Sequence, residues 1–468
     1  MLYFKTEPWI HQRKALEYFM SRAAQGLTYG ALFTDMGTGK TKIMIDFINN
    51  MPFKIILVVC PKKAANVWIR QFKIHSYNEI CVHNVVDWSG NKKVKKLQHL
   101  KTIPEEPVVI VCNYESVWRE PFRSFLLNKL KIDCVICDES HRIKSPGAKC
   151  SSFLTLIGRR VKYRYMLTGT PLGQSPLDIY AQYRYLAPEI FGTNYSNFKN
   201  RYANMINMGD YEMLDKKNPY RNLDELKELM FSCAFMMKSN VTLPKIHTVR
   251  VEYQVSSKLE KVYRELAREG AMEIEGGTIE TKNILSMITR FQQILGGYIP
   301  VEYEEDGLPV TRILPVDTSR IETYEELIEG LPLHEPIVVF CRHRKDIENV
   351  ISASEKTGRA CSEVSGKCDE SEQWIDGNTD IVVVQIQAGA ESLDFTRARY
   401  CIYYTLHPSL ILWKQSRKRL HRPGQTRPVV YYVLQAKMRK GKAIDEKMYI
   451  ALRHNKEVID SIMEDGWM

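Results

Sequence analysis

The sequence predicts an α/β protein with two parallel-sheet lobes and a helical insertion between them. Short apolar runs alternate with longer amphipathic segments in the first part of the chain, and the same alternation resumes near residue 336. This pattern is typical of buried parallel strands joined by helices. A chain of 468 residues also exceeds what one hydrophobic core usually supports. We therefore expect lobe 1 over residues 1–172, the insertion over 173–335 and lobe 2 over 336–468.

The predicted strands of lobe 1 are short and almost entirely apolar: Ala31–Phe33, Ile55–Cys60, Val108–Cys112, Cys134–Cys137 and Tyr163–Leu167. Polar motifs follow three of these runs directly, at Asp35–Thr41, Asp138–His141 and Thr168–Pro171. Ligands of parallel α/β sheets bind at the carboxyl ends of the strands. We therefore expect the three motifs to meet at one edge of the first sheet.

The insertion and lobe 2 follow from the change in pattern after Pro171. Polar or turn-rich segments separate the predicted helices of the middle section: Pro176–Leu186, Leu223–Met237, Ser256–Glu269 and Thr281–Leu295. Lobe 2 has predicted strands near Ile337–Cys341, Ala360–Val364, Ile381–Gln385, Tyr400–Thr405 and Val429–Leu434. Its predicted helices lie near His343–Glu355, Ser409–Leu420 and Lys442–Met463.

The charge of the chain favours a polyanionic partner. Lys and Arg total 66 against 55 Asp and Glu, which gives a net charge of +11. Most of the excess lies in one stretch, because Arg397–Arg453 holds 14 basic and 2 acidic residues. A nucleic acid would suit this surplus, and an ordinary solvated basic face is the alternative.

The spacing of the cysteines and the lengths of the apolar runs indicate the cellular compartment in which we expect the protein. Eleven cysteines are scattered without a disulfide pattern, and the first residues lack the pattern of a secretory signal. These features predict a reducing compartment, either cytoplasmic, in a bacterial or virus-infected cell, or nuclear in a eukaryote. Cys134 and Cys137 lie within a predicted strand, so we expect both in the core. The apolar runs are far shorter than the roughly 20 residues of a membrane span, and no membrane association is expected.

The segment Asp35–Thr41 has the residue types that a nucleoside triphosphate requires. Backbone N–H groups at a helix start can cage phosphates, Lys40 can reach the β and γ oxygens, and the Thr41 hydroxyl can bind Mg²⁺. We predict that the nucleotide binds Gly37, Thr38, Gly39, Lys40 and Thr41. Thr34 stands where the full P-loop pattern has a glycine. The alternative is an ordinary glycine turn before a helix.

The acidic pair Asp138-Glu139 complements this loop. Phosphoryl transfer needs one carboxylate to hold the metal and its water shell, and another group to position the attacking water. We assign these tasks to Asp138 and Glu139 respectively, and we expect Thr41 and Asp138 to hold Mg²⁺. Taken alone, the pair could be a solvated strand end. The two motifs occur in order, each after a buried-looking strand, and this makes coincidence a poor explanation.

Lobe 2 has no Gly-rich Lys-Thr loop, so we expect it to contribute residues to the nucleotide of lobe 1. The segment Gln415–Gln425 is the candidate, and in it Arg419 and Arg422 are placed on one helical face. An arginine that reaches the γ-phosphate stabilises transition-state charge. We predict this catalytic role for Arg419 and Arg422, with a merely basic helix as the alternative.

With these residues in place, the chain resembles the Swi/Snf-type ATPases of helicase superfamily 2, and in size it is similar to a small stand-alone bacterial or viral member. The resemblance extends over nearly the whole chain. In order, it rests on a Gln motif, motifs I, Ia, Ib, II and III, and motifs V and VI, at Pro8–Gln12, Asp35–Thr41, Leu57–Pro61, Asn113–Glu115, Asp138–His141, Leu167–Leu172, Ala388–Asp394 and Gln415–Gln425. The family usually has glycines at the positions of Ala390 and Ser392, and asparagine at Asp394.

The resemblance implies two RecA-like lobes and roles for further residues. Gln12 would contact the adenine and Asp394 the ribose. The residues that would couple hydrolysis to lobe movement are His141, Thr168, Thr170 and Gln415. Lys238 and Leu243-Pro244 lie near the place where the family has a basic residue and a Leu-Pro pair.

The function expected from these features is that of an ATP-dependent, helicase-like DNA translocase with ATP and Mg²⁺ as ligands. We expect a monomer that steps along duplex rather than single-stranded DNA, with backbone contacts from Lys62, Lys63 and Asn113. One alternative is an ATP-gated nucleic-acid clamp without translocation. Another is a P-loop phosphotransferase acting on a small molecule, for which the basic stretch would serve only solubility.

Overall fold

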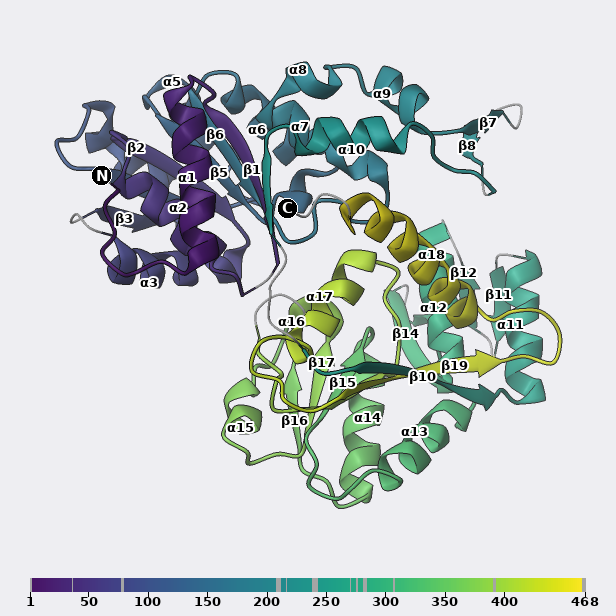
Figure 1. Cartoon of the computed structure of the whole chain (residues 1–468). Coiled ribbons are helices and arrows are strands. Elements are labelled where there is room, and N and C mark those ends of the chain that lie inside the picture. The colour runs from purple at the N-terminus through teal and green to yellow at the C-terminus, as the bar shows by residue number, and fades with distance from the viewer. Residues whose placement is uncertain are drawn as a thin grey trace. The chain divides into compact units, whose positions relative to one another are not determined.

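The computed structural model of the chain consists of two compact units (Figure 1). It describes residues 2–35, 37–76, 80–207, 212–215, 217–237, 243–269, 271–274, 277–280, 284–305, 308–389 and 393–464. Unit 1 comprises Met1–Asn240 with Lys456–Met468, and unit 2 comprises Val241–Asn455. Each unit is built around its own parallel sheet, as the sequence predicts.

Unit 1 holds a seven-stranded sheet in the order β3-β4-β2-β5-β6-β1-β9, in which every neighbouring pair is parallel. Its strands are β1 (Tyr29–Thr34), β2 (Ile55–Cys60), β3 (Cys81–Asn84), β4 (Val108–Asn113), β5 (Cys134–Asp138), β6 (Tyr163–Leu167) and β9 (Ala234–Met237). Every residue of β2, β4 and β5 is buried. Continuous apolar runs form these strands because both faces of the sheet are covered.

The helices of unit 1 are α1 (Ile10–Ala24), α2 (Lys40–Asn49), α3 (Ala65–His75), α4 (Gly90–Lys96), α5 (Phe122–Asn128), α6 (Lys149–Gly158), α7 (Ile179–Leu186), α8 (Pro188–Phe191), α9 (Tyr195–Tyr202) and α10 (Leu223–Phe231). A core that includes Leu16, Phe47 and Trp68 joins α1, α2 and α3 to the sheet. Short β7 (Met205–Asn207) and β8 (Glu212–Leu214) form an antiparallel pair.

Unit 2 holds a six-stranded sheet in the order β10-β19-β18-β15-β17-β16, also parallel throughout. These strands are β10 (Ile246–Gln254), β15 (Ile337–Cys341), β16 (Cys361–Val364), β17 (Ile381–Gln385), β18 (Tyr400–Tyr403) and β19 (Val429–Lys437). The helices are α11 (Ser257–Glu269), α12 (Ile284–Leu295), α13 (Ser319–Glu329), α14 (Arg344–Lys356), α15 (Ser371–Ile375), α16 (Ile386–Gly389) and α17 (Leu410–Leu420), while α18 (Ile444–Glu464) contributes to both units.

The middle section differs from the expected helical insertion. Residues 173–240 belong to unit 1 and supply β9 to its sheet, whereas the rest belongs to unit 2 and supplies β10. The boundaries expected at residues 172 and 335 therefore do not coincide with the division into units. A four-stranded antiparallel sheet also lies here, formed by β11 (Ala271–Ile274), β12 (Gly277–Glu280), β13 (Tyr298–Glu305) and β14 (Leu308–Pro315). Most residues of edge strand β10 are exposed, so its sequence lacks the apolar run of a central strand.

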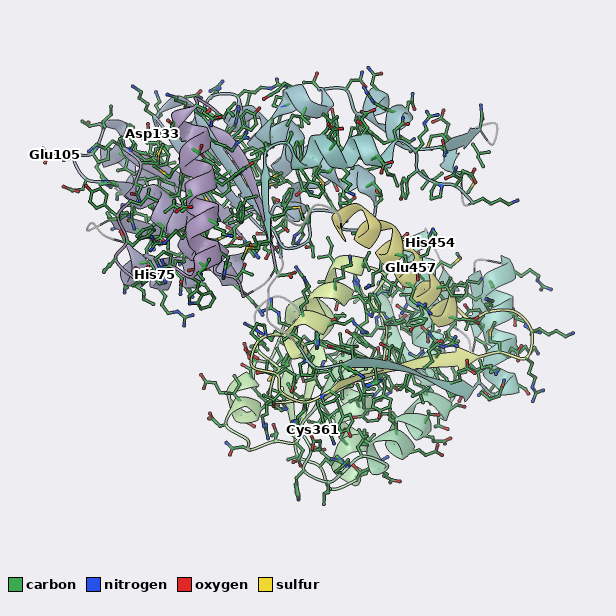
Figure 2. All side chains as sticks on the ribbon, in the orientation of Figure 1. His75, Glu105, Asp133, Cys361, His454 and Glu457 are labelled. Carbon is green, nitrogen blue, oxygen red and sulfur yellow. The ribbon has the colours of Figure 1, made fainter. Side chains whose placement is uncertain are left out.

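The two ends of the first sheet have different tasks. At the amino ends, Asp133, which is labelled in Figure 2, accepts hydrogen bonds at Oδ2 from the backbone N–H groups of Lys54 (2.8 Å) and Ile55 (3.0 Å). These bonds join the start of β5 to the start of β2. The predicted functional motifs follow the carboxyl ends of the strands.

Within the described part of the chain, no helix combines the length and the apolar character needed to cross a membrane.

Candidate functional site

The three motifs predicted to meet do meet at the carboxyl edge of the first sheet. β5, β6 and β1 are neighbours, and the register pairs Asp138 with Leu167 and Leu167 with Leu32. The backbone N–H of Thr168 continues the ladder by donating to the carbonyl of Leu32 (3.1 Å). The loops after β1, β5 and β6 therefore start side by side.

The loop after β1 has the backbone of a phosphate cradle. Gly37 and Gly39 both have φ of +82°, in the region that favours glycine, and Gly39 precedes the first turn of α2. A Cβ atom on Gly39 would clash with Nε2 of Gln12. The start of α2 leaves backbone N–H groups without helical partners, and such groups suit an anion. Met36 lies outside the described residues.

Thr34, the departure from the P-loop pattern, has a structural role. The buried hydroxyl of Thr38 lies 2.9 Å from Oγ1 of Thr34 and donates 2.7 Å to the carbonyl of Asp35. Nζ of Lys40 donates to the carbonyls of Thr34 (3.1 Å) and Asp35 (3.3 Å). Side-chain contacts thus hold the loop closed where the usual pattern has a glycine.

Gln12 braces the same loop. Its side chain is 4% exposed; Oε1 accepts from the Trp9 backbone N–H (2.9 Å), and Nε2 donates to the carbonyl of Thr38 (3.1 Å). Nε2 of His11 lies 2.8 Å from that carbonyl and must therefore be its protonated donor nitrogen. His11 was not among the predicted site residues, and its position next to Gln12 is the signal in the sequence that could have identified it. The adenine contact of Gln12 stays a prediction.

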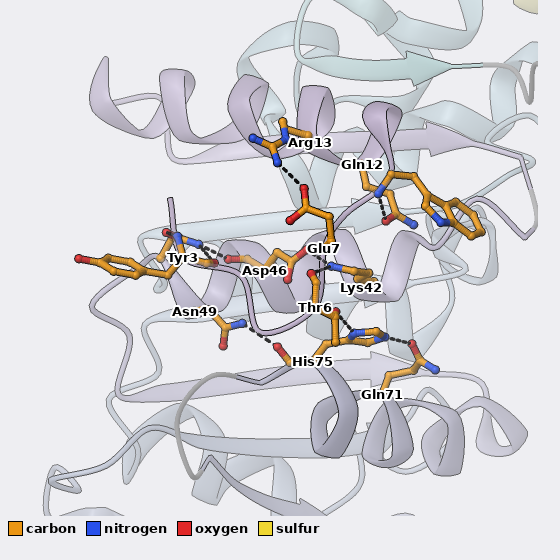
Figure 3. A network of polar contacts seen from close by, with 12 residues as sticks. Tyr3, Thr6, Glu7, Gln12, Arg13, Lys42, Asp46, Asn49, Gln71 and His75 are labelled. Atoms are coloured by element: carbon orange, nitrogen blue, oxygen red, sulfur yellow. Dashed lines mark hydrogen bonds and ion pairs between the residues drawn. The ribbon is translucent and has the colours of Figure 1, made fainter. Parts of the chain in front are cut away.

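The segment before α1 is tied to α2 and α3 by a polar network (Figure 3). Lys42 forms a buried ion pair with Asp46 (2.6 Å) and donates to the carbonyl of Thr6 (3.1 Å). Thr6 Oγ1 lies 2.5 Å from Nδ1 of His75. Burial raises the pKa of Asp46, and Lys42 partly offsets this. These contacts fix the helix whose amino end faces the phosphate cradle.

Asp138 ends β5 in a nearly dry environment. Its side chain accepts hydrogen bonds from the indole Nε1 of Trp68 (2.8 Å, at Oδ2) and from the Glu139 backbone N–H (3.0 Å, at Oδ1). Burial, followed by the charge of Glu139, raises the pKa of Asp138 to about 6. Trp68 is 0% exposed, and nothing in the sequence indicated its contact with Asp138.

Glu139 has a strained backbone and a link to motif III. Its φ of +53° is uncommon for a residue with a side chain, and such strain is concentrated at functional sites. The Thr168 hydroxyl lies 3.4 Å from Oε2 of Glu139, and Nδ1 of His141 lies 3.3 Å from both groups. The Thr170 N–H donates to Oγ1 of Thr168 (3.0 Å). Glu139, the residue predicted to position the attacking water, thus forms one cluster with three of the predicted coupling residues, His141, Thr168 and Thr170.

Gln182 on α7 extends this cluster and was missed from the sequence. It is fully buried, its Oε1 accepts from the hydroxyl of Ser140 (2.8 Å), and its Nε2 donates to the carbonyl of Pro171 (2.7 Å). One side chain therefore connects the segment after β5 to the segment after β6. The signal in the sequence was weak, because a glutamine within a helix is usually on the surface.

The residues present suit Mg²⁺ bound together with a nucleotide. Among the described residues, no group of three or more His, Cys, Asp or Glu could hold a metal unaided. Mg²⁺ usually takes one or two protein carboxylates plus substrate phosphates and waters. Asp138 at the end of β5 and Thr41 in the first turn of α2 match this donor set.

In unit 2, Arg419 lies in the last turn of α17, whereas Arg422 follows the helix, which ends at Leu420. The expectation that both share one helical face is therefore wrong, since Pro423 excludes continued helix before it. Arg422 forms an ion pair with Asp394 (Nη1 to Oδ2, 3.3 Å). Arg422, a predicted catalytic residue, is thus paired with Asp394, the residue expected to contact the ribose.

Other residues of Gln415–Gln425 shape this region. Nε2 of Gln425 donates to the carbonyls of Ala398 (2.8 Å) and Thr396 (3.1 Å), and Nε2 of His421 lies 2.7 Å from the carbonyl of Pro244. Gln415 is 1% exposed, and its Oε1 has no hydrogen-bond partner among the described residues. Ala390, Ser392 and Lys238 lie outside the described residues.

The predicted DNA-contacting residues follow β2 and β4. Lys62 forms an exposed ion pair with Asp87 (2.8 Å). Asn113 is 7% exposed, and its amide donates to Glu115 (2.8 Å) and accepts from the Ser116 hydroxyl. These bonds leave little of the Asn113 side chain for a phosphate. Lys63 lies beside Lys62 in a short 3₁₀ turn, Lys62–Ala64.

Comparison with protein families gives a match for most of the chain. The SNF2-related domain matches residues 11–296, which include Gln12 and motifs I to III. The chain belongs to the SNF2-related family. The helicase conserved C-terminal domain matches residues 320–424, which include Asp394, Gln415 and both arginines. The protein is therefore an ATP-binding SNF2-family ATPase of helicase superfamily 2.

Several proteins resemble this SNF2-family ATPase along much or part of its length. Protein CHROMATIN REMODELING 19 of Arabidopsis thaliana is 22% identical over 97% of this chain and 69% of its own length. The ATP-dependent DNA helicase DDM1 of the same plant is 22% identical over 91% of this chain and 58% of its own. DNA excision repair protein ERCC-6-like of Danio rerio is 28% identical over 42% of this chain, which spans 14% of that protein.

A solved structure also aligns with the SNF2-family ATPase. It is described as the Sulfolobus solfataricus SWI2/SNF2 ATPase core in complex with dsDNA. It is 19% identical, covers 100% of this chain and 95% of its own, and has a TM-score of 0.45.

Proposed function

We propose that this SNF2-family ATPase is a DNA-stimulated motor that couples ATP hydrolysis to stepping along duplex DNA. The observation that carries the proposal is the meeting of the Lys40 loop, Asp138-Glu139 and Thr168-Thr170 at one edge of the first sheet. A site of this kind binds, orients and polarises a triphosphate, which is most of what phosphoryl transfer requires.

Each residue has a stated task in the proposed cycle. Lys40 leaves the carbonyls of Thr34 and Asp35 to neutralise the β and γ oxygens, while Thr41 and Asp138 hold Mg²⁺. That ion supplies charge stabilisation for the phosphates when it is bound. Glu139 orients the attacking water. Arg419 and Arg422 of unit 2 stabilise the charge that develops on the γ-phosphate.

The contacts of Glu139 suggest how turnover is transmitted. Loss of the γ-phosphate changes the charge that Glu139 faces, and Glu139 lies next to Thr168 and His141. Thr168 in turn holds the Thr170 backbone, and Gln182 holds the Pro171 carbonyl. We infer that these links carry the nucleotide state to the segment after β6 and so to the grip on DNA.

DNA as the track is supported by charge and by relatives. The net charge is +11, and the whole basic stretch Arg397–Arg453 lies in unit 2. The name of the similar DDM1 protein describes it as an ATP-dependent DNA helicase. Contacts to the backbone give affinity without sequence preference, which suits a protein that moves along its track.

Phosphate release tests the proposal. Turnover should be measured at low salt without nucleic acid and with duplex, single-stranded and forked DNA. We expect duplex DNA to stimulate turnover most strongly and added salt to reduce the stimulation, because the contacts are electrostatic. A rate of phosphate release that none of the three nucleic acids changes would instead favour a phosphotransferase that acts on a small molecule.

A further inference from the structure

A basic groove of about 720 Å³ opens on unit 2, between α11 and the segment that follows β19. Figure 1 shows this segment passing beside α11 before it enters α18. The groove is lined by five cationic side chains: Lys261, Arg264, Arg268, Arg439 and Lys440. Two carboxylates, Glu260 and Glu265, also line it, which leaves a surplus of three positive charges.

A buried carboxylate builds this groove. Glu260 is 5% exposed, and it accepts hydrogen bonds from the backbone N–H groups of Arg439 (3.3 Å) and Lys440 (3.2 Å). It also pairs with Arg264, whose Nη2 donates to the carbonyl of Lys440 (3.3 Å). The Glu260 carboxylate thus fixes the backbone of the Arg439-Lys440 loop. The side chains of Arg439 and Lys440 are not needed for this anchor, and both residues are exposed.

The cations on α11 are arranged along one face. Lys261 and Arg268 are seven residues apart and lie on the same side of the helix as Glu265, about 10 Å apart along the axis. A single phosphate would not need cations over this length, whereas a chain of phosphates would. Like charges held close together repel each other, and an anionic partner removes this cost.

The groove lies on the edge of the sheet where ligands are expected. α11 follows β10 and the Arg439-Lys440 loop follows β19, so both start at carboxyl ends of neighbouring parallel strands. β15, β17 and β18 end on the same edge because the sheet is parallel throughout. The basic run Lys437–Lys442 lies outside the nucleotide motifs, and two of its residues, Arg439 and Lys440, line the groove.

We propose that this groove binds the phosphodiester backbone of DNA as a contact site additional to the nucleotide motifs. The proposal rests on the proposed function, since it names where unit 2 contacts the track. Several guanidinium and ammonium groups along an open groove favour a continuous backbone over a free nucleotide. Contacts of this kind add affinity and salt dependence without sequence preference.

The Arg439→Ala/Lys440→Ala double variant tests the groove. Alanine keeps the two backbone N–H groups that Glu260 binds, so the loop anchor remains. Affinity for a labelled duplex should be measured by fluorescence anisotropy across a salt series without nucleotide. We expect affinity to fall roughly five- to tenfold for each lost contact at 0.1 M salt. The slope of log affinity against log salt should become shallower by about 2, and DNA-free turnover should not change.

A matched control removes two charges elsewhere on unit 2. Lys245 precedes β10 and Lys356 ends α14, so both exposed lysines lie toward the amino edge of the sheet. Lys245→Ala/Lys356→Ala should bind DNA like the wild type. An equal loss in this control, or wild-type affinity and slope in the groove variant, would overturn the groove proposal. If DNA also stimulates wild-type turnover, the proposed function stands; a wild type that neither binds nor responds to DNA would end both.

Discussion

Nε1 of Trp68 donates a 2.8 Å hydrogen bond to Oδ2 of Asp138, which joins a fully buried tryptophan on α3 to the carboxylate at the end of β5. The bond holds the carboxylate in one orientation and favours its charged form, against the effects of burial and of Glu139. Trp68 is therefore a positioning residue for the proposed Mg²⁺ site.

Trp68→Phe should lower the apparent affinity for Mg²⁺ more than it lowers the stability of the fold. Phenylalanine keeps most of the buried ring but removes the donor, so Asp138 loses orientation and its pKa rises further. Loss of a partner to a metal ligand typically costs roughly 10- to 100-fold in metal affinity. The measurement is turnover against Mg²⁺ concentration at several pH values, and we expect the half-saturating Mg²⁺ to rise and the acidic limb to move to higher pH.

Trp413→Phe is the matched control for this prediction. Trp413 is also buried, but its Nε1 has no hydrogen-bond partner among the described residues. It should leave the Mg²⁺ dependence unchanged. Equal effects of the two substitutions would show that ring packing, rather than the bond to Asp138, sets the metal response.

Asp138→Asn should stabilise the nucleotide-free protein and abolish turnover. The pKa of Asp138 is raised from 3.8 to about 6, so the folded state binds the proton more tightly than the unfolded state. Its contribution to stability is therefore present below about pH 4 and lost as pH rises through about 6. Asparagine keeps the bond from Trp68 and removes the buried charge.

Thermal denaturation at pH 5 and pH 7.5 checks this prediction. We expect Asp138→Asn to raise the melting temperature more at pH 7.5, where the wild-type carboxylate is charged. Asparagine has one acceptor oxygen and cannot also accept from the Glu139 N–H, which shifts the melting temperature equally at both pH values. A difference between variant and wild type that is the same at pH 5 and pH 7.5 would therefore contradict the raised pKa. The same linkage predicts that Mg²⁺-dependent turnover falls as pH drops below about 6.

Glu139→Gln should bind ATP and fail to hydrolyse it. Glutamine can still accept the Thr168 hydrogen bond but is a poor base, and loss of such a group typically costs roughly 10²- to 10⁴-fold in rate. Nucleotide binding and phosphate release should be measured on the same sample. Lys40→Ala is the comparison, since it should lose binding itself, and normal hydrolysis by Glu139→Gln would make the assignment of Glu139 wrong.

Arg419→Ala and Arg422→Ala should each reduce turnover by roughly 10³-fold or more while DNA affinity changes little. Both arginines are proposed to act on transition-state charge. Arg417→Ala is the contrast, because the Arg417 guanidinium lies 3.9 Å from the centre of the Tyr431 ring and its Nη2 donates to Thr248 (3.1 Å). That variant should lose stability. A fall in DNA affinity for the first two variants would mark them as backbone contacts.

Much of unit 1 could be predicted because its central strands are continuous apolar runs and each is followed directly by polar residues. The meeting of Lys40, Glu139 and Thr168 at one edge follows from that pattern and from the parallel sheet. The partners of these residues could not be predicted in the same way. A tryptophan such as Trp68 has the same sequence signal whether or not its N–H finds an acceptor.

Other features depend on tertiary structure that local patterns do not contain. β10 is an exposed edge strand and has no apolar run, and Gln182 has its role only because α7 packs beside two loop segments. The helix end at Leu420 was predicted, but the spacing of Arg419 and Arg422 was interpreted as one helical face, although Arg422 lies beyond that end. The positive φ of Glu139 has no sequence signal at all.

The central claim is that hydrolysis at this site moves the protein along duplex DNA, and displacement of a third strand from a DNA triplex tests it most directly. We expect the wild type to release the third strand with ATP and not with a non-hydrolysable analogue, and Glu139→Gln to release none. A wild type whose ATP turnover is stimulated by DNA but which leaves the triplex intact would contradict translocation and identify an ATP-gated clamp.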